Sequence, residues 1–89
     1  MIIRKFYADW CNPCKQMTPI VEEVAESFVN VKVENINIED EANAALMESC
    51  AVKSIPTFDF LSDKGERLHY HVGRLTKEQL TNILEENGA

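Results

Sequence analysis

Phe6-Tyr7-Ala8-Asp9-Trp10-Cys11-Asn12-Pro13-Cys14-Lys15 contains a Cys-x-x-Cys pair between two segments of different periodicity. Residues 2–8, before the pair, are rich in β-branched and aromatic side chains, which favours a strand. After the pair, apolar residues recur at the spacing of one helix face, which predicts a helix over about residues 12–28. Pro13 suits the first turn of that helix, whereas Pro19 removes a backbone hydrogen bond inside it and is expected to bend it.

Turn residues and changes in periodicity divide the rest of the chain into five further elements. In chain order we expect a strand at 31–38, a helix at 40–50, a strand around 58–60, a strand at 67–72 and a helix between the capping box Thr76/Gln79 and Gly88. Ser62-Asp63-Lys64-Gly65 is a turn signal that joins the last two strands into an antiparallel hairpin. The order β-α-β-α-β-β-α predicts an α/β protein whose four-stranded mixed sheet is flanked by helices.

Alternation within the predicted elements assigns their side chains to faces. In the strand at 67–72, the expected apolar side consists of Leu68, Tyr70 and Val72. His69 and His71 are then expected to face the solvent together. In the helix at 40–50, the expected apolar face consists of Ala42, Ala45, Leu46 and Cys50. A cysteine on such a face usually packs as a small apolar residue.

Length and composition are those of one globular domain, which we expect to span residues 1–89. Apolar residues make up 45% of the chain and charged residues 27%. The net charge is -6 and the Lys and Arg residues are scattered, which argues against nucleic acid as a direct ligand. Charges interrupt the first apolar segment and no apolar run reaches membrane-spanning length, so we expect a cytoplasmic protein that does not bind a membrane.

Disulfide exchange is the chemistry that the Cys-x-x-Cys pair favours. The chain has three cysteines, which are too few for a disulfide framework. A helix start stabilises a thiolate through its free N–H groups and its dipole, so Cys11 is expected to be the exposed attacking cysteine. Cys14, one turn later, is expected to resolve the resulting mixed disulfide. Pro13 stiffens this turn, and Trp10 gives apolar cover that an incoming protein would contact.

Half of a zinc site is the other arrangement that Cys-x-x-Cys serves, with Cys50, His69 or His71 as further ligands. The sequence has no second cysteine pair at zinc-finger spacing, and Pro13 between the two cysteines fits a helix start better than a metal loop. We therefore expect no metal, and exchange through two thiols requires no bound cofactor.

Four segments resemble the successive signatures of the thioredoxin family, in order and approximate spacing. They are the segment 6–15 quoted above, Asn-Ile-Asn-Ile-Glu at 35–39, Ser-Ile-Pro-Thr at 54–57 and Val-Gly-Arg-Leu-Thr-Lys at 72–77. The resemblance covers nearly the whole chain and implies a monomeric protein-disulfide reductase with a minimal thioredoxin fold. It also implies disulfide-containing protein substrates and re-reduction by a thioredoxin-reductase-like flavoprotein.

The same resemblance assigns roles to the residues of the site. It makes Cys11 the nucleophile and Cys14 the resolving cysteine. It makes Pro56 a cis-proline that faces the dithiol. The residues that it implies for the substrate groove are Trp10, Pro13, Ile55, Pro56 and Gly73.

The chain departs from the family's pattern in several places. The family's opening strand and helix are not found before the motif, so the strand at 31–38 is expected to be an exposed edge. Asn12 replaces the glycine that most thioredoxins have before the proline. Lys5 lies where thioredoxins resemble one another in a buried Asp, and Asn35 lies where they commonly have its Lys partner.

Lys5 is therefore a candidate modulator of the redox chemistry, and three readings of it stay open. Water that enters where the helix is missing can replace the acid as a proton acceptor. Lys5 can instead favour a thiolate electrostatically. In the third reading, Lys5 is a salt-bridged, solvent-reaching residue without a redox role.

Two other functions are compatible with the sequence. A glutaredoxin-like or isomerase-like exchange protein has a similarly short fold, although Trp10 and the segment 54–57 look like thioredoxin. A non-catalytic binding module would use the surface of Trp10, Ile55 and Gly73 to hold a partner without turnover.

Overall fold

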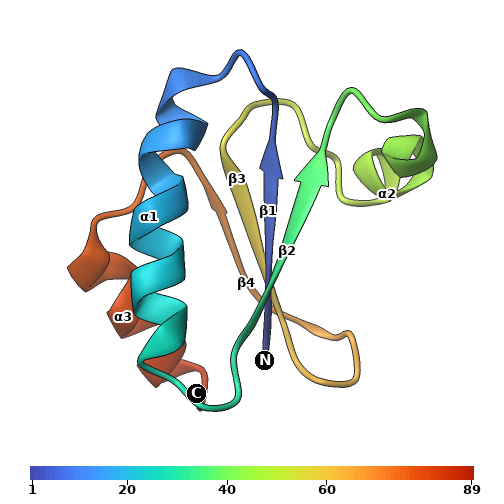
Figure 1. Cartoon of the computed structure of the whole chain (residues 1–89). Coiled ribbons are helices and arrows are strands. Elements are labelled where there is room, and N and C mark those ends of the chain that lie inside the picture. Colours follow the sequence, from blue (N-terminus) through green and yellow to red (C-terminus); the bar gives the residue numbers. More distant parts are fainter.

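The computed structural model describes residues 1–89 and contains a sheet between helices (Figure 1). Its elements are β1 (Ile2–Tyr7), α1 (Asn12–Glu26), β2 (Lys32–Asn37), the 3-10 helix η1 (Glu41–Asn43), α2 (Ala44–Ser49), β3 (Thr57–Leu61), β4 (Arg67–Val72) and α3 (Lys77–Glu86). The predicted β-α-β-α-β-β-α order is confirmed. The capping box at the start of α3 is also confirmed, because Thr76 and Gln79 each bond the other's backbone N–H.

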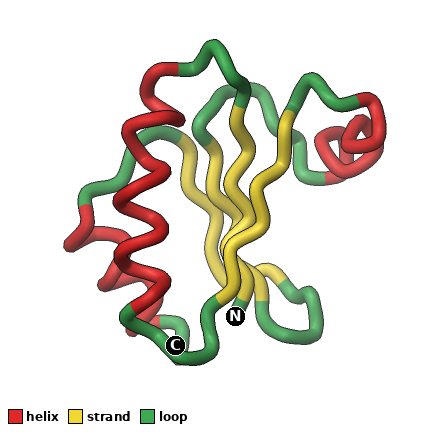
Figure 2. Tube along the Cα trace, viewed as in Figure 1, coloured by secondary structure: helices red, strands yellow, loops and turns green.

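The strands form one mixed sheet in the order β2-β1-β3-β4 (Figure 2). β1 pairs parallel with β2 and antiparallel with β3, and β3 pairs antiparallel with β4. β1 and β3 are therefore central. β2 lies at an edge, as predicted, and none of its residues is fully buried.

The core lies between the sheet and the pair α1 and α3, which cover one side of the sheet while α2 lies on the other (Figure 1). Its buried members are Met1, Ile3, Met17, Val21, Val24, Phe58, Phe60, Leu75, Leu80 and Leu84. Full burial of a large apolar side chain contributes roughly 1.5–3 kcal/mol, so this one cluster supplies much of the stability of so short a chain. The cluster packs α1 against β1 and so holds the Cys-x-x-Cys pair in place at the start of α1.

The helix expected at 40–50 is shorter and broken into η1 and α2. Asp40 caps η1 by accepting a hydrogen bond from the N–H of Ala42 at 3.0 Å. The predicted apolar face is wrong in part, because Ala42 and Ala45 are exposed while Cys50 is buried. A 3-10 helix turns by a larger angle per residue than an α-helix. Apolar residues at α-helical spacing therefore do not share one face across η1 and α2.

The predicted faces of β4 are wrong, because pairing with β3 reverses them. His69 and His71 lie opposite Phe60 and Phe58, whose side chains are in the core. His69 is half-buried with its ring edge-on to Phe60, at 5.6 Å between ring centres. Val72 is 53% exposed. Phe58 and Phe60 determine which side of the hairpin faces the core. The alternation of apolar and polar residues in β4, an edge strand, does not by itself show which side that is.

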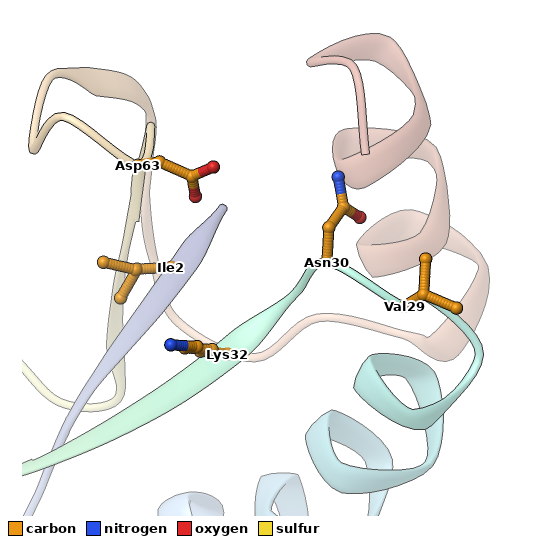
Figure 3. Close-up of a pocket in the computed structure, with 5 residues that line it drawn as sticks. All are labelled: Ile2, Val29, Asn30, Lys32 and Asp63. Atoms are coloured by element: carbon orange, nitrogen blue, oxygen red, sulfur yellow. The ribbon is translucent and has the colours of Figure 1, made fainter.

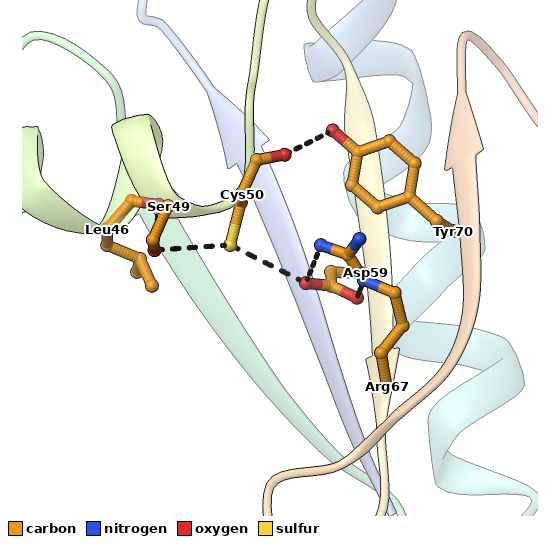
Figure 4. A network of polar contacts seen from close by, with 6 residues as sticks. All are labelled: Leu46, Ser49, Cys50, Asp59, Arg67 and Tyr70. Carbon is orange, nitrogen blue, oxygen red and sulfur yellow. Dashed lines mark hydrogen bonds and ion pairs between the residues drawn. The ribbon is translucent and has the colours of Figure 1, made fainter.

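A polar network on the other face of the sheet joins β3, β4 and the end of α2 (Figure 4). Asp59 is buried on β3 and accepts two hydrogen bonds from Arg67, at 3.0 and 3.1 Å. The Cys50 thiol lies 3.7 Å from the same carboxylate, and the Tyr70 hydroxyl donates to the Cys50 carbonyl oxygen at 3.1 Å. The hydrogen bond to Asp59 raises the pKa of Arg67, so the guanidinium stays protonated.

We expect this ion pair to respond asymmetrically to the loss of either partner. Arg67→Met leaves the buried carboxylate of Asp59 unpaired and should lower the free energy of unfolding by about 3 kcal/mol. Asp59→Asn leaves the guanidinium, whose side chain is 47% exposed, able to reach water, and should cost only about 1 kcal/mol. Urea unfolding of both variants at one pH measures the difference.

The matched control for this prediction is Arg4→Met. Arg4 pairs with Glu34 at 3.0 Å, but the Glu34 side chain is exposed, so the loss should stay below about 1 kcal/mol. Equal losses for Arg67→Met and Arg4→Met would contradict the structural importance of the Asp59 network.

Candidate active site

The Cys-x-x-Cys pair lies where β1 ends and α1 begins. Cys11 is the N-cap of α1, and Cys14 lies in its first turn. The two are joined as a disulfide, with 5.3 Å between their Cα atoms. Both side chains are buried, Cys11 at 5% exposed and Cys14 at 2%. The expectation that Cys11 is exposed is therefore wrong for this oxidised form, in which Cys11 packs with Cys14, Ala8, Ile38 and Ile55.

The helix start acts directly on the sulfur of Cys11. The backbone N–H of Cys14 donates a hydrogen bond to Cys11 Sγ at 3.2 Å. A free N–H and the positive end of the helix dipole both stabilise a negative sulfur at this position. No acidic residue occupies the first turn of α1, so no carboxylate there opposes this effect. Pro13 lies exposed in the same turn, as the sequence predicts.

A hollow of about 140 Å³ lies beside Trp10, the residue that precedes Cys11, and most of its lining is apolar. It is lined by Trp10, Ile38, Met47, Val52, Lys53, Ser54 and Ile55. Two of these residues, Ile38 and Ile55, also pack against the small cluster of Ala8, Cys11 and Cys14. The Trp10 side chain is 64% exposed at its rim. Met47 and Val52 were not predicted for the groove, because their placement depends on the break between η1 and α2.

Pro56 and Gly73 are brought together on the neighbouring loops. The Ile55–Pro56 peptide bond is cis, as the resemblance implied. The Pro56 carbonyl oxygen accepts a hydrogen bond from the N–H of Gly73 at 2.8 Å. Gly73 has φ of +101°, a conformation that side chains other than glycine rarely adopt. This hydrogen bond joins the loop that contains Ile55 and Pro56 to the loop that contains Gly73.

Lys5 is buried, with 4% of its surface exposed, and points to α1. Its ammonium group donates a hydrogen bond to Thr18 Oγ1 at 2.6 Å. Burial lowers the pKa of Lys5, and the charge of Glu22 offsets part of that effect. Of the three readings left open by the sequence, a salt-bridged Lys5 is wrong, because Lys5 takes part in none of the ion pairs.

The residues weighed as zinc ligands do not gather around the cysteine pair. No group of three His, Cys, Asp or Glu side chains has a metal-binding arrangement. Cys50 belongs to the Asp59 network, and Nε2 of His71 lies 3.2 Å from the carbonyl oxygen of Arg74.

The helices are all too short or too polar to cross a membrane.

A separate cavity of about 360 Å³ lies at the opposite end of β1 from the dithiol (Figure 3). It is lined by Ile2, Val29, Asn30, Lys32 and Asp63. This lining offers no thiol or imidazole, so the cavity is not part of the site.

Comparison with known proteins gives a consistent result. The family model for thioredoxin matches residues 1–86. Thioredoxin of Buchnera aphidicola subsp. Schizaphis graminum is 40% identical over 97% of this chain and 78% of its own length. Thioredoxin of Chlamydia pneumoniae is 36% identical over 98% and 82%. The structure of a mutant thioredoxin from Halobacterium salinarum NRC-1 superposes with a TM-score of 0.88 and 32% identity, covering 99% of this chain and 74% of that one.

Proposed function

Because this chain belongs to the thioredoxin family and is a thiol-disulfide oxidoreductase that reduces protein disulfides, we propose that Cys11 attacks the substrate and Cys14 resolves the mixed disulfide. The observation that carries this assignment is the hydrogen bond from the Cys14 N–H to Cys11 Sγ at the start of α1. It gives the sulfur of Cys11 a stabilising donor, whereas no such donor reaches the sulfur of Cys14, which lies within the first turn of the helix.

The reaction then runs in two exchanges. The Cys11 thiolate attacks one sulfur of the substrate disulfide, which breaks the substrate S–S bond and releases one substrate thiolate. The Cys14 thiolate next attacks Cys11 Sγ, which breaks the mixed disulfide and releases the second substrate thiolate. The product is the Cys11–Cys14 disulfide, and two electrons have passed to the substrate, whose thiolates take protons from water.

Alkylation of the reduced protein tests this assignment of roles. At neutral pH a limiting amount of iodoacetamide should modify Cys11 first, because the thiolate is the reactive form and Cys11 holds the helix-start position. Peptide mass mapping reads out which cysteine carries the label. First modification of Cys14 would reverse the two roles, and buried Cys50 serves as the internal reference for an unactivated thiol.

The groove beside the dithiol is the proposed contact for the substrate's backbone and apolar side chains. Its proposed residues are Trp10, Pro13, Ile55, Pro56 and Gly73. The exposed indole of Trp10 and the apolar hollow next to it support this proposal. Such a surface favours an unfolded or flexible protein segment, because such a segment can place its backbone and its apolar side chains against the hollow together.

Trp10→Ala is expected to separate protein substrates from small ones. The substitution should raise KM for insulin reduction about tenfold, in line with one buried aromatic contact of about 1–2 kcal/mol, and leave reduction of a small symmetrical disulfide nearly unchanged. Leu68→Ala is the control, because Leu68 is a half-exposed apolar residue outside the groove. An equal effect on both substrates would contradict the groove.

A thioredoxin-reductase-like flavoprotein is the proposed electron donor, and the protein is proposed to act as a monomer in the cytoplasm. A dithiol that reduces other proteins must be kept reduced, which suits a reducing compartment. Titration against a thioredoxin-reductase system and against glutathione tests this proposal. Efficient coupling to glutathione alone would favour the glutaredoxin-like alternative.

A further inference from the structure

The ammonium group of Lys5 lies inside the fold, on the central strand β1, and faces the helix that carries the dithiol. A buried charge normally has an ionic partner, because removing it from water is costly. Lys5 has none: it is absent from the four ion pairs of the structure, and its one hydrogen bond is to the hydroxyl of Thr18. Its positive charge is therefore not neutralised by a direct contact.

Thr18 links this charge to the resolving cysteine. The Thr18 hydroxyl accepts from Lys5 Nζ at 2.6 Å and donates to the backbone carbonyl oxygen of Cys14 at 3.3 Å. Thr18 lies one helical turn after Cys14, so the two contacts hold the ammonium group beside the first turns of α1. Lys5 is thus connected to Cys14 through two hydrogen bonds and a single side chain.

Water has access to this arrangement through a cavity of about 200 Å³. The cavity is lined by Lys5, Tyr7, Thr18 and Asn35. No carboxylate is among these residues, so nothing in the lining accepts a proton from a thiol as a basic group. Lys5 supplies the only formal positive charge of the lining.

We propose that Lys5 is a positioning residue for the resolving step, in which its ammonium group, held by Thr18 beside Cys14, stabilises the Cys14 thiolate. This inference rests on the proposed roles of Cys11 and Cys14. Cys14 gives its proton to water, and its sulfur then bonds to Cys11 Sγ as the bond from Cys11 to the substrate sulfur breaks. The substrate leaves as a thiolate with the bonding electron pair, and Lys5 keeps its proton throughout. A positive charge near a thiol favours the thiolate.

Lys5→Met tests the proposal with a side chain of similar length and no charge. In a reduced Cys11→Ser background, which leaves Cys14 free of coupling to a second active-site thiol, NMR titration of the Cys14 Cβ signal reports its pKa. The substitution should raise the pKa of Cys14 by about one pH unit, and Lys5→Asp should raise it further. Thr18→Val, which keeps the charge but removes the link, should cause a smaller rise. Lys64→Met, in the exposed turn, is the charge control and should cause none.

Kinetics give a second readout in the chain that retains Cys11. A one-unit rise reduces the thiolate fraction about tenfold at neutral pH but makes the remaining thiolate more nucleophilic, so Lys5→Met should slow mixed-disulfide resolution about threefold. Formation of the mixed disulfide at Cys11 should change less. An unchanged pKa of Cys14 in both Lys5→Met and Lys5→Asp would overturn the inference, while continued disulfide reduction by the same variants would leave the proposed function intact. If the wild-type protein itself failed to reduce a protein disulfide, the proposed function would be overturned instead.

Discussion

Cys11→Ser is expected to lower the rate of insulin-disulfide reduction by at least about 10³-fold, the scale of loss found when a covalent nucleophile is removed. A serine hydroxyl stays protonated near neutral pH and does not attack a disulfide, whereas the Cys11 sulfur has a stabilising N–H donor at the helix start. The other two cysteines should not take over, because neither sulfur accepts a hydrogen bond from a backbone N–H, as Cys11 Sγ does. The assay follows insulin precipitation with dithiothreitol as the electron source.

Cys50→Ser is the matched control for this loss. It makes the same exchange of sulfur for oxygen outside the dithiol and should retain most of the activity. The Cys11→Ser/Cys14→Ser double variant separates an exchange enzyme from a binding module, since a module that only holds partners would keep its effect. Retained reduction in the double variant would contradict the dithiol mechanism.

Cys14→Ser is expected to turn the protein from a catalyst into a trap. Cys11 can still attack, but no second thiol lies one turn away to break the mixed disulfide, so the adduct should accumulate to nearly one substrate molecule per protein. Turnover should fall to about the level of release by added thiols. Non-reducing electrophoresis and mass mapping of the adduct measure both effects, and the bond should be mapped to Cys11.

The control for trapping is the double variant, which should form no adduct. Adducts mapped to Cys50 in Cys14→Ser would mean that the buried third cysteine, not Cys11, is the reactive one. Failure to recover any adduct under conditions in which a thioredoxin with the same substitution traps partners would contradict the roles of the two cysteines.

The dithiol and the helices that position it were predictable because their signals are local. Cys11 and Cys14 mark the start of α1 by their spacing and by Pro13, and the structure places all three there. The capping box at Thr76 is equally local, since its partners lie three residues apart. Such features depend on neighbours in the chain and not on the packing of distant elements.

The features that sequence reasoning missed depend on partners far along the chain. Asp59 is buried because Arg67, across the hairpin, pairs with it, and a single aspartate between two phenylalanines gives no sign of that. His69 lies on the core side because β3 fixes the register of β4. Lys5 is buried because it lies on the central strand β1 and its side chain reaches Thr18 on α1. In each case tertiary pairing overrides the local pattern.

The central claim, reduction of protein disulfides by exchange at Cys11 and Cys14, is tested most directly by a single-turnover experiment. Fully reduced protein is mixed with an equal amount of a protein that carries one disulfide, the reaction is quenched with acid, and all cysteines are mapped by mass spectrometry. The account predicts that substrate disulfide is lost in equal measure to the gain of the Cys11–Cys14 disulfide, with Cys50 still a free thiol. Loss of substrate disulfide without formation of the Cys11–Cys14 bond, or with oxidation of Cys50 in its place, would contradict it.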